Sequence, residues 1–202
     1  MFGGSIDADG FQRETTSMEP VSPYAAGKLL AHQIARNYRR FYGMFISNGI
    51  LFNHESPRRG KNFVTGKICS EAVKIKYGLA DKLELGNVDA RRDWGHAKDY
   101  VRAMWLILQP DVPDDFVCAT GITHSVRDVA DYVFRKLDLD PKKYVSINED
   151  LLRAADGHSP RGDSSKLRQT IGWEPEYTFE TMLDEMVDHW LEELKPVGLP
   201  KE

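Results

Sequence analysis

Apolar residues recur at helical spacing in the first regular stretch of the chain, residues 23–42. A period of about 3.6 residues predicts an amphipathic helix. The apolar residues that show this period are Leu29, Leu30, Ile34, Ala35, Tyr38 and Phe41. Gly43 is the kind of residue that ends a helix. The next stretch, 44–52 (MFISNGILF), is apolar at both alternating sets of positions. This pattern predicts a strand buried in a parallel sheet.

Before the first helix, residues 1–23 are expected to form a loop. After the strand 44–52, predicted helices and strands continue to alternate along the chain. Residues 148–162 are expected to form a loop or a short helix, and Ser125 is a candidate N-cap. Alternation of this kind is typical of α/β proteins. The predicted helices cover 63–77, 96–109, 124–137, 163–171 and 178–194, and the predicted strands cover 82–86, 116–120 and 145–147.

Composition and charge narrow the functional classes. The chain has 202 residues, 41% of them hydrophobic, and no apolar run long enough to span a membrane, so we expect a soluble, cytoplasmic protein. A net charge of -4 gives no electrostatic reason to expect nucleic acid or an anionic membrane as a partner. Cys69 and Cys118 lie far apart in apolar surroundings, which favours a reduced compartment and shows no metal-ligand spacing.

A tyrosine and a lysine stand four residues apart near the start of the first helix, in the stretch SPYAAGK. Tyr24 and Lys28 would therefore lie one above the other on the same helix face. An ammonium group beside a phenol stabilises the phenolate, which is the form that acts as a general base. For the bare spacing alone, an ordinary surface pair on an amphipathic helix is the more common explanation.

Basic and amide side chains follow the predicted strand 44–52, in the segment NHESPRRG. In α/β sheets, ligands bind beyond the carboxyl ends of the strands, so Asn53, His54 and Arg59 stand at a suitable place for a site. Arginine offers fork-shaped donors for phosphate. Lys67 follows at the start of the next helix, where anions are favoured. A solvated basic turn is the competing interpretation.

Two further segments contain candidate ligand-binding arginines. In DARRDWGHAKDY, one of the adjacent arginines could face a diphosphate, and we favour Arg92, which stands beside Asp93, over Arg91. In LLRAADGHSP, Arg153 and Asp156 could clamp a base or a ribose. A surface ion pair of little energetic value is the simpler explanation for this second pair.

Taken together and in this order, several motifs closely resemble the GDP-mannose 4,6-dehydratase family of extended short-chain dehydrogenases/reductases. The resemblance is strong over 1–137 and again over 163–175. The motifs that carry it are SPYAAGKLLAH, NGILFNHESPRRG, FVTGK, LGN-x-DARRDWGHAKDYVRAMW and ATGITHSVRD.

The resemblance implies a reaction and a role for each candidate residue. GDP-mannose would lose water to give GDP-4-keto-6-deoxymannose, with NADP as internal hydride carrier. Tyr24 would be the catalytic base and Lys28 its partner at the nicotinamide ribose; both would also contact the cofactor. His54 and Arg59 match NADP-binding positions. The positions matching those that hold the GDP-sugar are Asn53, Lys67, Arg92 and Arg153.

Two departures from the family pattern bear on activity. The family's Thr/Ser-x-Glu segment, with its catalytic threonine and glutamate, would precede Met1, and no Gly-x-x-Gly-x-x-Gly turn occurs in the 202 residues. We therefore expect the chain alone not to dehydrate GDP-mannose. The guanosine clamp, Arg-Pro-x-Glu in the family, reads Arg153-Ala-Ala-Asp156 here, which leaves open which nucleotide sugar is bound.

The sequence thus predicts an α/β chain that comprises a truncated Rossmann-type NAD(P)-binding fold and a small α/β substrate-binding domain. Residues 1–53 would belong to the dinucleotide-binding domain, and 54–202 mainly to the nucleotide-sugar-binding domain, with short returns to the cofactor sheet. We expect a homo-oligomer or association with a complementary N-terminal half. The alternatives are another GDP-sugar reductase or epimerase of the same superfamily, and a non-catalytic remnant or subunit.

Overall fold

The computed structural model of the protein describes residues 1–152 and 159–195, and these form two compact units. The first unit comprises Met1–His54, Arg92–Thr123 and His158–Glu176, and the second comprises Glu55–Arg91, His124–Gly157 and Tyr177–Glu202. Helices alternate with short strands, and two strand pairs are parallel, so the predicted α/β class is confirmed. The proposed roles of the two domains stay a prediction.

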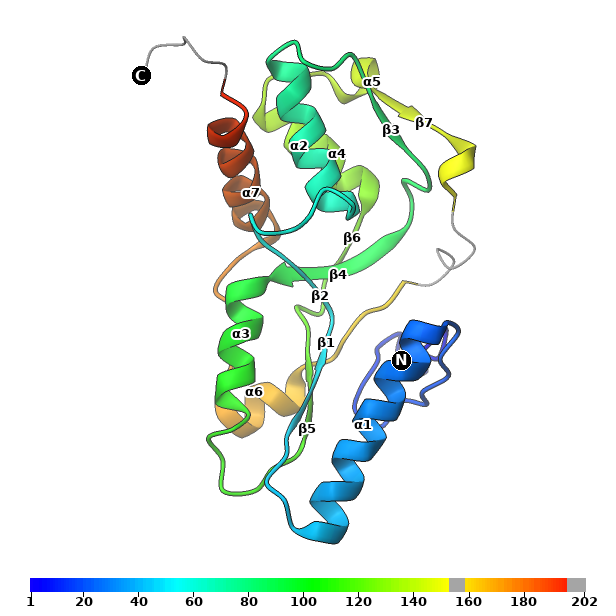
Figure 1. Ribbon diagram of the computed structural model, residues 1–202, viewed down its shortest axis with the longest axis vertical. Helices are drawn as coiled ribbons and strands as arrows, with labels where there is room; N and C mark the ends of the chain where they lie inside the picture. The colour runs from blue at the N-terminus through cyan, green and yellow to red at the C-terminus, as the bar shows by residue number, and fades with distance from the viewer. Residues whose placement is uncertain (153–158, 196–202) are drawn as a thin grey trace. The chain divides into compact units, whose positions relative to one another are not determined.

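In the first unit, a parallel strand pair lies between two helices (Figure 1). Strand β1 (Asn48–Leu51) pairs with β5 (Asp115–Cys118), with Ile50 opposite Val117. Helices α1 (Pro23–Tyr42) and α3 (Ala97–Leu106) lie on opposite sides of this pair, and α6 (Ser165–Ile171) packs against β5. The core contains Phe2, Ile50, Phe52, Tyr100, Phe116, Leu167 and Trp173.

In the second unit, three helices pack side by side (Figure 1). These are α2 (Val64–Lys76), α4 (Val126–Lys136) and α7 (Phe179–Glu193). Beside them, β3 (Leu83–Leu85) pairs in parallel with β7 (Val145–Ile147), which follows α5 (Pro141–Tyr144) and precedes the 3-10 turn η1 (Glu149–Leu151). The buried side chains include Ile68, Val73, Val129, Val133, Phe134, Leu183 and Met186.

A third group of strands has the order β2-β4-β6. These are β2 (Asn53–Glu55), β4 (Arg91–His96) and β6 (Thr123–Ser125). The sequence pattern did not predict β4 or β6. Ser125 is the N-cap of α4, as expected, and closes a capping box with Asp128.

The strand predicted over 44–52 is shorter and more exposed than expected. Only Asn48–Leu51 is a strand; its Ile50 is buried, Gly49 is exposed and the other two residues are half-buried. The parallel pairing is therefore confirmed, whereas burial on both faces is wrong. Met44 and Phe45, counted in the strand because they are apolar, precede it and are exposed.

The carboxylate of Asp115, at the start of β5, attaches α1 to the strand pair. Its Oδ1 accepts a hydrogen bond of 2.7 Å from Asn48 Nδ2 and lies 2.9 Å from Arg39 Nη1. Its Oδ2 lies 3.3 Å from Arg36 Nε and 3.8 Å from His32 Nε2. Burial alone would raise the pKa of Asp115, but the hydrogen bonds from Arg39 and Asn48 outweigh it and hold the pKa below its ordinary value.

We expect His32 to make stability depend on pH near neutrality. Burial lowers the pKa of His32, and the positive charges of Arg36 and Arg39 add to this against the attraction of Asp115. The unfolded chain then binds the proton more readily, so stability is lost as pH falls below about 6.5. Urea unfolding should give a smaller loss of stability between pH 7 and pH 5 for His32→Gln than for the wild type. Identical losses in the two proteins would contradict this assignment.

Candidate functional site

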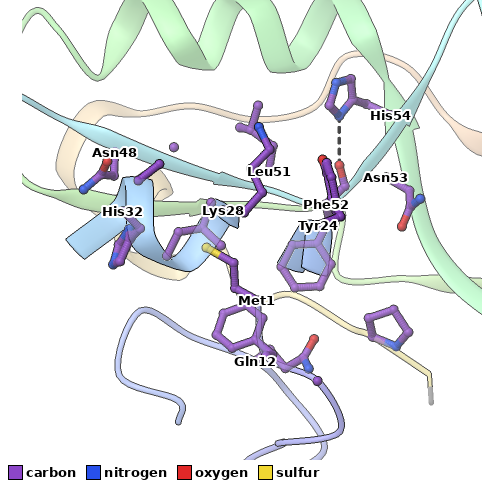
Figure 2. A pocket seen from close by; sticks show the side chains of 16 residues that line it. Met1, Gln12, Tyr24, Lys28, His32, Asn48, Leu51, Phe52, Asn53 and His54 are labelled. Atoms are coloured by element: carbon purple, nitrogen blue, oxygen red, sulfur yellow. Dashed lines mark hydrogen bonds between the residues drawn. The ribbon is translucent and has the colours of Figure 1, made fainter. Parts of the chain in front are cut away.

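A pocket of about 550 Å³ lies within the first unit, between the start of α1, the strand β1 and the N-terminal loop. Ser22 caps α1 by accepting a hydrogen bond of 3.1 Å from the Ala25 amide, and Pro23 occupies the first turn. Tyr24 and Lys28 both line the pocket, so the structure places the predicted pair in one cavity (Figure 2).

Tyr24 and Lys28 belong to a stripe of residues along one face of α1. His32 follows Lys28 at the same four-residue spacing and also lines the pocket. Arg36 and Arg39 continue the stripe to the carboxylate of Asp115. The ion pairs at one end of the stripe therefore fix the helix rotation that directs Tyr24 and Lys28 into the pocket at the other end.

The phenol of Tyr24 is open to a ligand. The residue is 76% exposed although it lines the pocket, and the Lys28 Nζ lies 5.7 Å from the centre of its ring. The ammonium thus lies over the face of the Tyr24 ring, and its N–H groups can donate to a ligand hydroxyl.

Asn53 and His54, the first two residues of β2, line the same pocket (Figure 2). The His54 Nδ1 lies 2.8 Å from the carbonyl oxygen of Phe52, so Nδ1 carries the proton and donates. The ring stacks on Tyr100 with 4.8 Å between the ring centres. In the neutral imidazole this orientation leaves the Nε2 lone pair to accept a hydrogen bond from a ligand.

Arg59 belongs to the second unit, where a buried carboxylate holds it. The Arg59 Nε lies 2.8 Å from Glu55 Oε2 as an ion pair whose N–H is not aligned for a hydrogen bond. The guanidinium lies 3.5 Å from the centre of the Phe63 ring. Glu55 is 2% exposed and accepts a 2.8 Å hydrogen bond from Thr65 Oγ1. Burial raises the pKa of Glu55 despite these two partners.

The other predicted residues are distributed over both units. Lys67, on α2 of the second unit, donates a 2.6 Å hydrogen bond to the Glu84 carbonyl, and its remaining N–H groups can serve a ligand. Arg92 is half-buried on β4 of the first unit. Arg153 and Asp156 lie outside the described residues.

The buried side chain of Asp93 holds two main-chain segments in place, at Thr120–Gly121 and at Gly162. Its buried carboxylate accepts hydrogen bonds of 2.9 Å and 2.6 Å from the amide and hydroxyl of Thr120, 2.9 Å from the Gly121 amide and 3.2 Å from the Gly162 amide. Burial nevertheless raises the pKa of Asp93. A Cβ on Gly162 would lie 2.3 Å from the Ala119 Cβ, so the close contact between these two segments of the chain requires glycine at position 162.

Sequence reasoning missed several residues that line the pocket, among them the polar side chains of His32 and Gln12. His32 could have been found by extending the Tyr24–Lys28 spacing by one more turn. Gln12 also lines the pocket, but it stands in an irregular loop and has no periodic signal. Only the folded chain places it there.

Comparison with known proteins identifies the family. The sequence model of the family described as GDP-mannose 4,6 dehydratase matches residues 1–186. GDP-mannose 4,6 dehydratase 2 of Arabidopsis thaliana is 52% identical over 181 residues, which cover 90% of this chain and 48% of that protein. The human GDP-mannose 4,6 dehydratase is 45% identical over 193 residues, covering 87% of this chain and 52% of that protein. The chain therefore spans about half the length of these relatives.

Solved structures show the same fold at low sequence identity. RMD from Pseudomonas aeruginosa, solved with NADPH, superposes with a TM-score of 0.84 at 21% identity over 95% of this chain and 63% of that one. DesIV, a dTDP-glucose 4,6-dehydratase from Streptomyces venezuelae solved with NAD and TYD, gives 0.79 at 24% identity over 95% and 57%. These likenesses confirm the Rossmann-type fold, and the match over 1–186 shows that this chain belongs to the GDP-mannose 4,6-dehydratase family.

Proposed function

We propose that this chain carries the tyrosine–lysine part of a GDP-mannose 4,6-dehydratase active site. The reaction is the conversion of GDP-mannose to GDP-4-keto-6-deoxymannose and water, with NADP as the internal hydride carrier. Membership of the family supports the reaction. The observation that carries the proposal is that Tyr24, Lys28, Asn53 and His54 line one pocket.

The residues of the pocket fit a nicotinamide cofactor and a hexose. Tyr24, as phenolate, takes the proton of the hexose O4 hydroxyl while C4 becomes a carbonyl carbon. Lys28 stabilises that phenolate and donates to a hydroxyl of the nicotinamide ribose. NADP, when bound, supplies the hydride acceptor for C4 and the hydride donor for C6. The C5 proton and the C6 hydroxyl leave as water, a step that the resemblance assigns to a glutamate of the family's Thr/Ser-x-Glu segment. When C6 receives the hydride, C5 regains a proton, which balances the proton lost from O4.

The remaining candidates are proposed to bind and not to react. The His54 Nε2 accepts a hydrogen bond from the cofactor, and Asn53 contacts the sugar nucleotide. Arg59 contacts NADP, for which the ion pair with Glu55 and the face of Phe63 hold its guanidinium in place. Lys67 and Arg92 bind the GDP-sugar, and Arg153 is proposed for the same role.

Association with a complementary polypeptide is part of this proposal and rests on the exposed surface of α1. Several large apolar side chains of α1 are exposed, as expected of a helix that another polypeptide covers. They are Leu30, Ile34, Tyr38, Phe41 and Tyr42. A second copy of the chain is the other candidate for this surface. Among the described residues, none of the helices could cross a membrane. A cytoplasmic location stays a prediction.

Replacing the catalytic tyrosine should abolish most of the activity. The chain is co-expressed with the N-terminal half of the Arabidopsis relative, and conversion of GDP-mannose is followed with NADP present. We expect activity in the mixture, and a loss of roughly 10²- to 10⁴-fold in kcat for Tyr24→Phe because the general base is removed. Tyr42→Phe, at a similarly exposed tyrosine of the same helix, should retain activity.

Equal activity of Tyr24→Phe and Tyr42→Phe would contradict the assignment of Tyr24. Reduction or epimerisation of a GDP-sugar without loss of water would favour the alternative enzyme class. No activity in any mixture, together with no ligand binding, would favour the non-catalytic subunit. Turnover by the chain alone would overturn our expectation that it needs a complement.

Arg92 should contribute to GDP-mannose binding more than its neighbour does. Calorimetric titration of the chain with GDP-mannose should show binding that falls about 10- to 100-fold for Arg92→Ala, as expected when charge-assisted hydrogen bonds to a diphosphate are lost. Arg91→Ala removes the same charge from an exposed position and should have a smaller effect. A larger loss for Arg91→Ala would reverse the assignment, and GDP and UDP titrations report whether guanine is recognised.

A further inference from the structure

Gln12 is held rigidly in the N-terminal loop by main-chain hydrogen bonds. Its amide donates to the Arg161 carbonyl at 2.8 Å, and its carbonyl accepts from the Asp163 amide at 2.9 Å. These bonds form a parallel bridge to Gly162, whose own amide is held by the Asp93 carboxylate. The Gln12 backbone therefore has a fixed position at the pocket before any ligand binds.

The orientation of the Gln12 side-chain amide follows from its single partner. The Nε2 donates a 2.8 Å hydrogen bond to the Ser5 carbonyl. The flipped amide would place Oε1 against that carbonyl oxygen, which is repulsive. Figure 2 shows Nε2 directed to the N-terminal loop and Oε1 directed away from it, on the side of Tyr24.

The Oε1 atom is a buried acceptor without a donor. Gln12 is 4% exposed and lines the pocket, yet its Oε1 meets no hydrogen-bond donor among the residues that the structure describes. Buried polar atoms in proteins are almost always paired with protein, water or ligand. A preorganised, unpaired acceptor at the wall of a ligand pocket is therefore suited to a donor that the ligand brings.

We propose that Gln12 Oε1 accepts a hydrogen bond from an uncharged donor of the bound ligand. The donor is a hydroxyl of the hexose or the carboxamide N–H of nicotinamide; both have the same chemistry, and both ligands follow from the proposed function on which this inference rests. A cationic donor is disfavoured, because the Lys28 ammonium already lines the same pocket. Gln12 is then a specificity-determining residue, since a ligand that lacks the donor leaves the buried oxygen unpaired.

The test is a set of calorimetric titrations with GDP-mannose, its analogues deoxygenated at C2, C3, C4 or C6, NADP and the 3-acetylpyridine analogue of NADP, which lacks the carboxamide N–H. The proteins are the wild type, Gln12→Met, which removes the acceptor at similar length, and Gln12→Asn, which withdraws it by one methylene. Arg13→Met is the matched control, because Arg13 anchors the same loop through a 2.7 Å ion pair with Asp163 but is not part of the pocket lining.

We expect Gln12→Met and Gln12→Asn to weaken one ligand roughly tenfold. For the one analogue that lacks the donor, these variants should bind with the same affinity as the wild type. That analogue identifies the donor as a particular hydroxyl or as the carboxamide. Arg13→Met should bind every ligand within about twofold of the wild type. If Gln12→Met unfolds, Gln12→Asn is judged by the same criterion.

Three results would overturn the inference while the proposed function stands. They are wild-type affinities in both Gln12 variants, an equal loss for every ligand and analogue, and a loss that Arg13→Met reproduces. A wild-type chain that binds neither GDP-mannose nor NADP, alone or mixed with the N-terminal half of the Arabidopsis relative, would instead overturn the proposed function, and this inference with it.

Discussion

The carboxylate of Asp115 is the interaction on which the placement of the site depends. It is 7% exposed and joins Asn48 of β1 to Arg36 and Arg39 of α1. A buried charge of this kind is costly unless it is paired, so the arginines of α1 cannot leave without exposing or stranding the carboxylate. These ion pairs prevent α1 from sliding along its axis and from rotating about it. Tyr24 and Lys28 therefore lie over the end of β1.

This arrangement explains how a highly exposed helix can carry precise chemistry. His32 is the buried residue of α1, so apolar packing contributes little to its position. At the C-terminal end of α1, the ion pairs with Asp115 hold the helix in place of apolar packing. At its N-terminal end, the Ser22 cap and Pro23 define where the helix begins. The pocket between them combines a phenol, an ammonium, an imidazole with a defined tautomer and an amide oxygen, all supplied by the first unit. Glu55 positions Arg59 in the second unit by the same principle, a buried carboxylate beside a guanidinium.

Sequence reasoning succeeded where the signal is local and failed where partners are distant. The Tyr24–Lys28 spacing and the strand end at Asn53 and His54 are short-range patterns, and they indicated four residues of one pocket. The strand β4 was missed because RRDWGH neither alternates nor is uniformly apolar, since Asp93 and His96 are buried among apolar residues. Asp115 and Gln12 gave no signal, because their partners lie far along the chain, and only the fold brings Asp115 to α1 and Gln12 to Gly162.

The placement of α1 depends on the Asp115 carboxylate, and hydrogen exchange of the α1 amides tests this dependence most directly. Mass spectrometry would compare the wild type with Asp115→Asn and with Asp114→Asn, whose carboxylate is half exposed and pairs mainly with Lys166. We expect Asp115→Asn to speed exchange across Pro23–Tyr42 by about tenfold or more, as loss of a charged, partly buried anchor implies, while Asp114→Asn leaves it near the wild-type rate. Equal protection of α1 in all three proteins would contradict the claim that Asp115 places Tyr24 and Lys28.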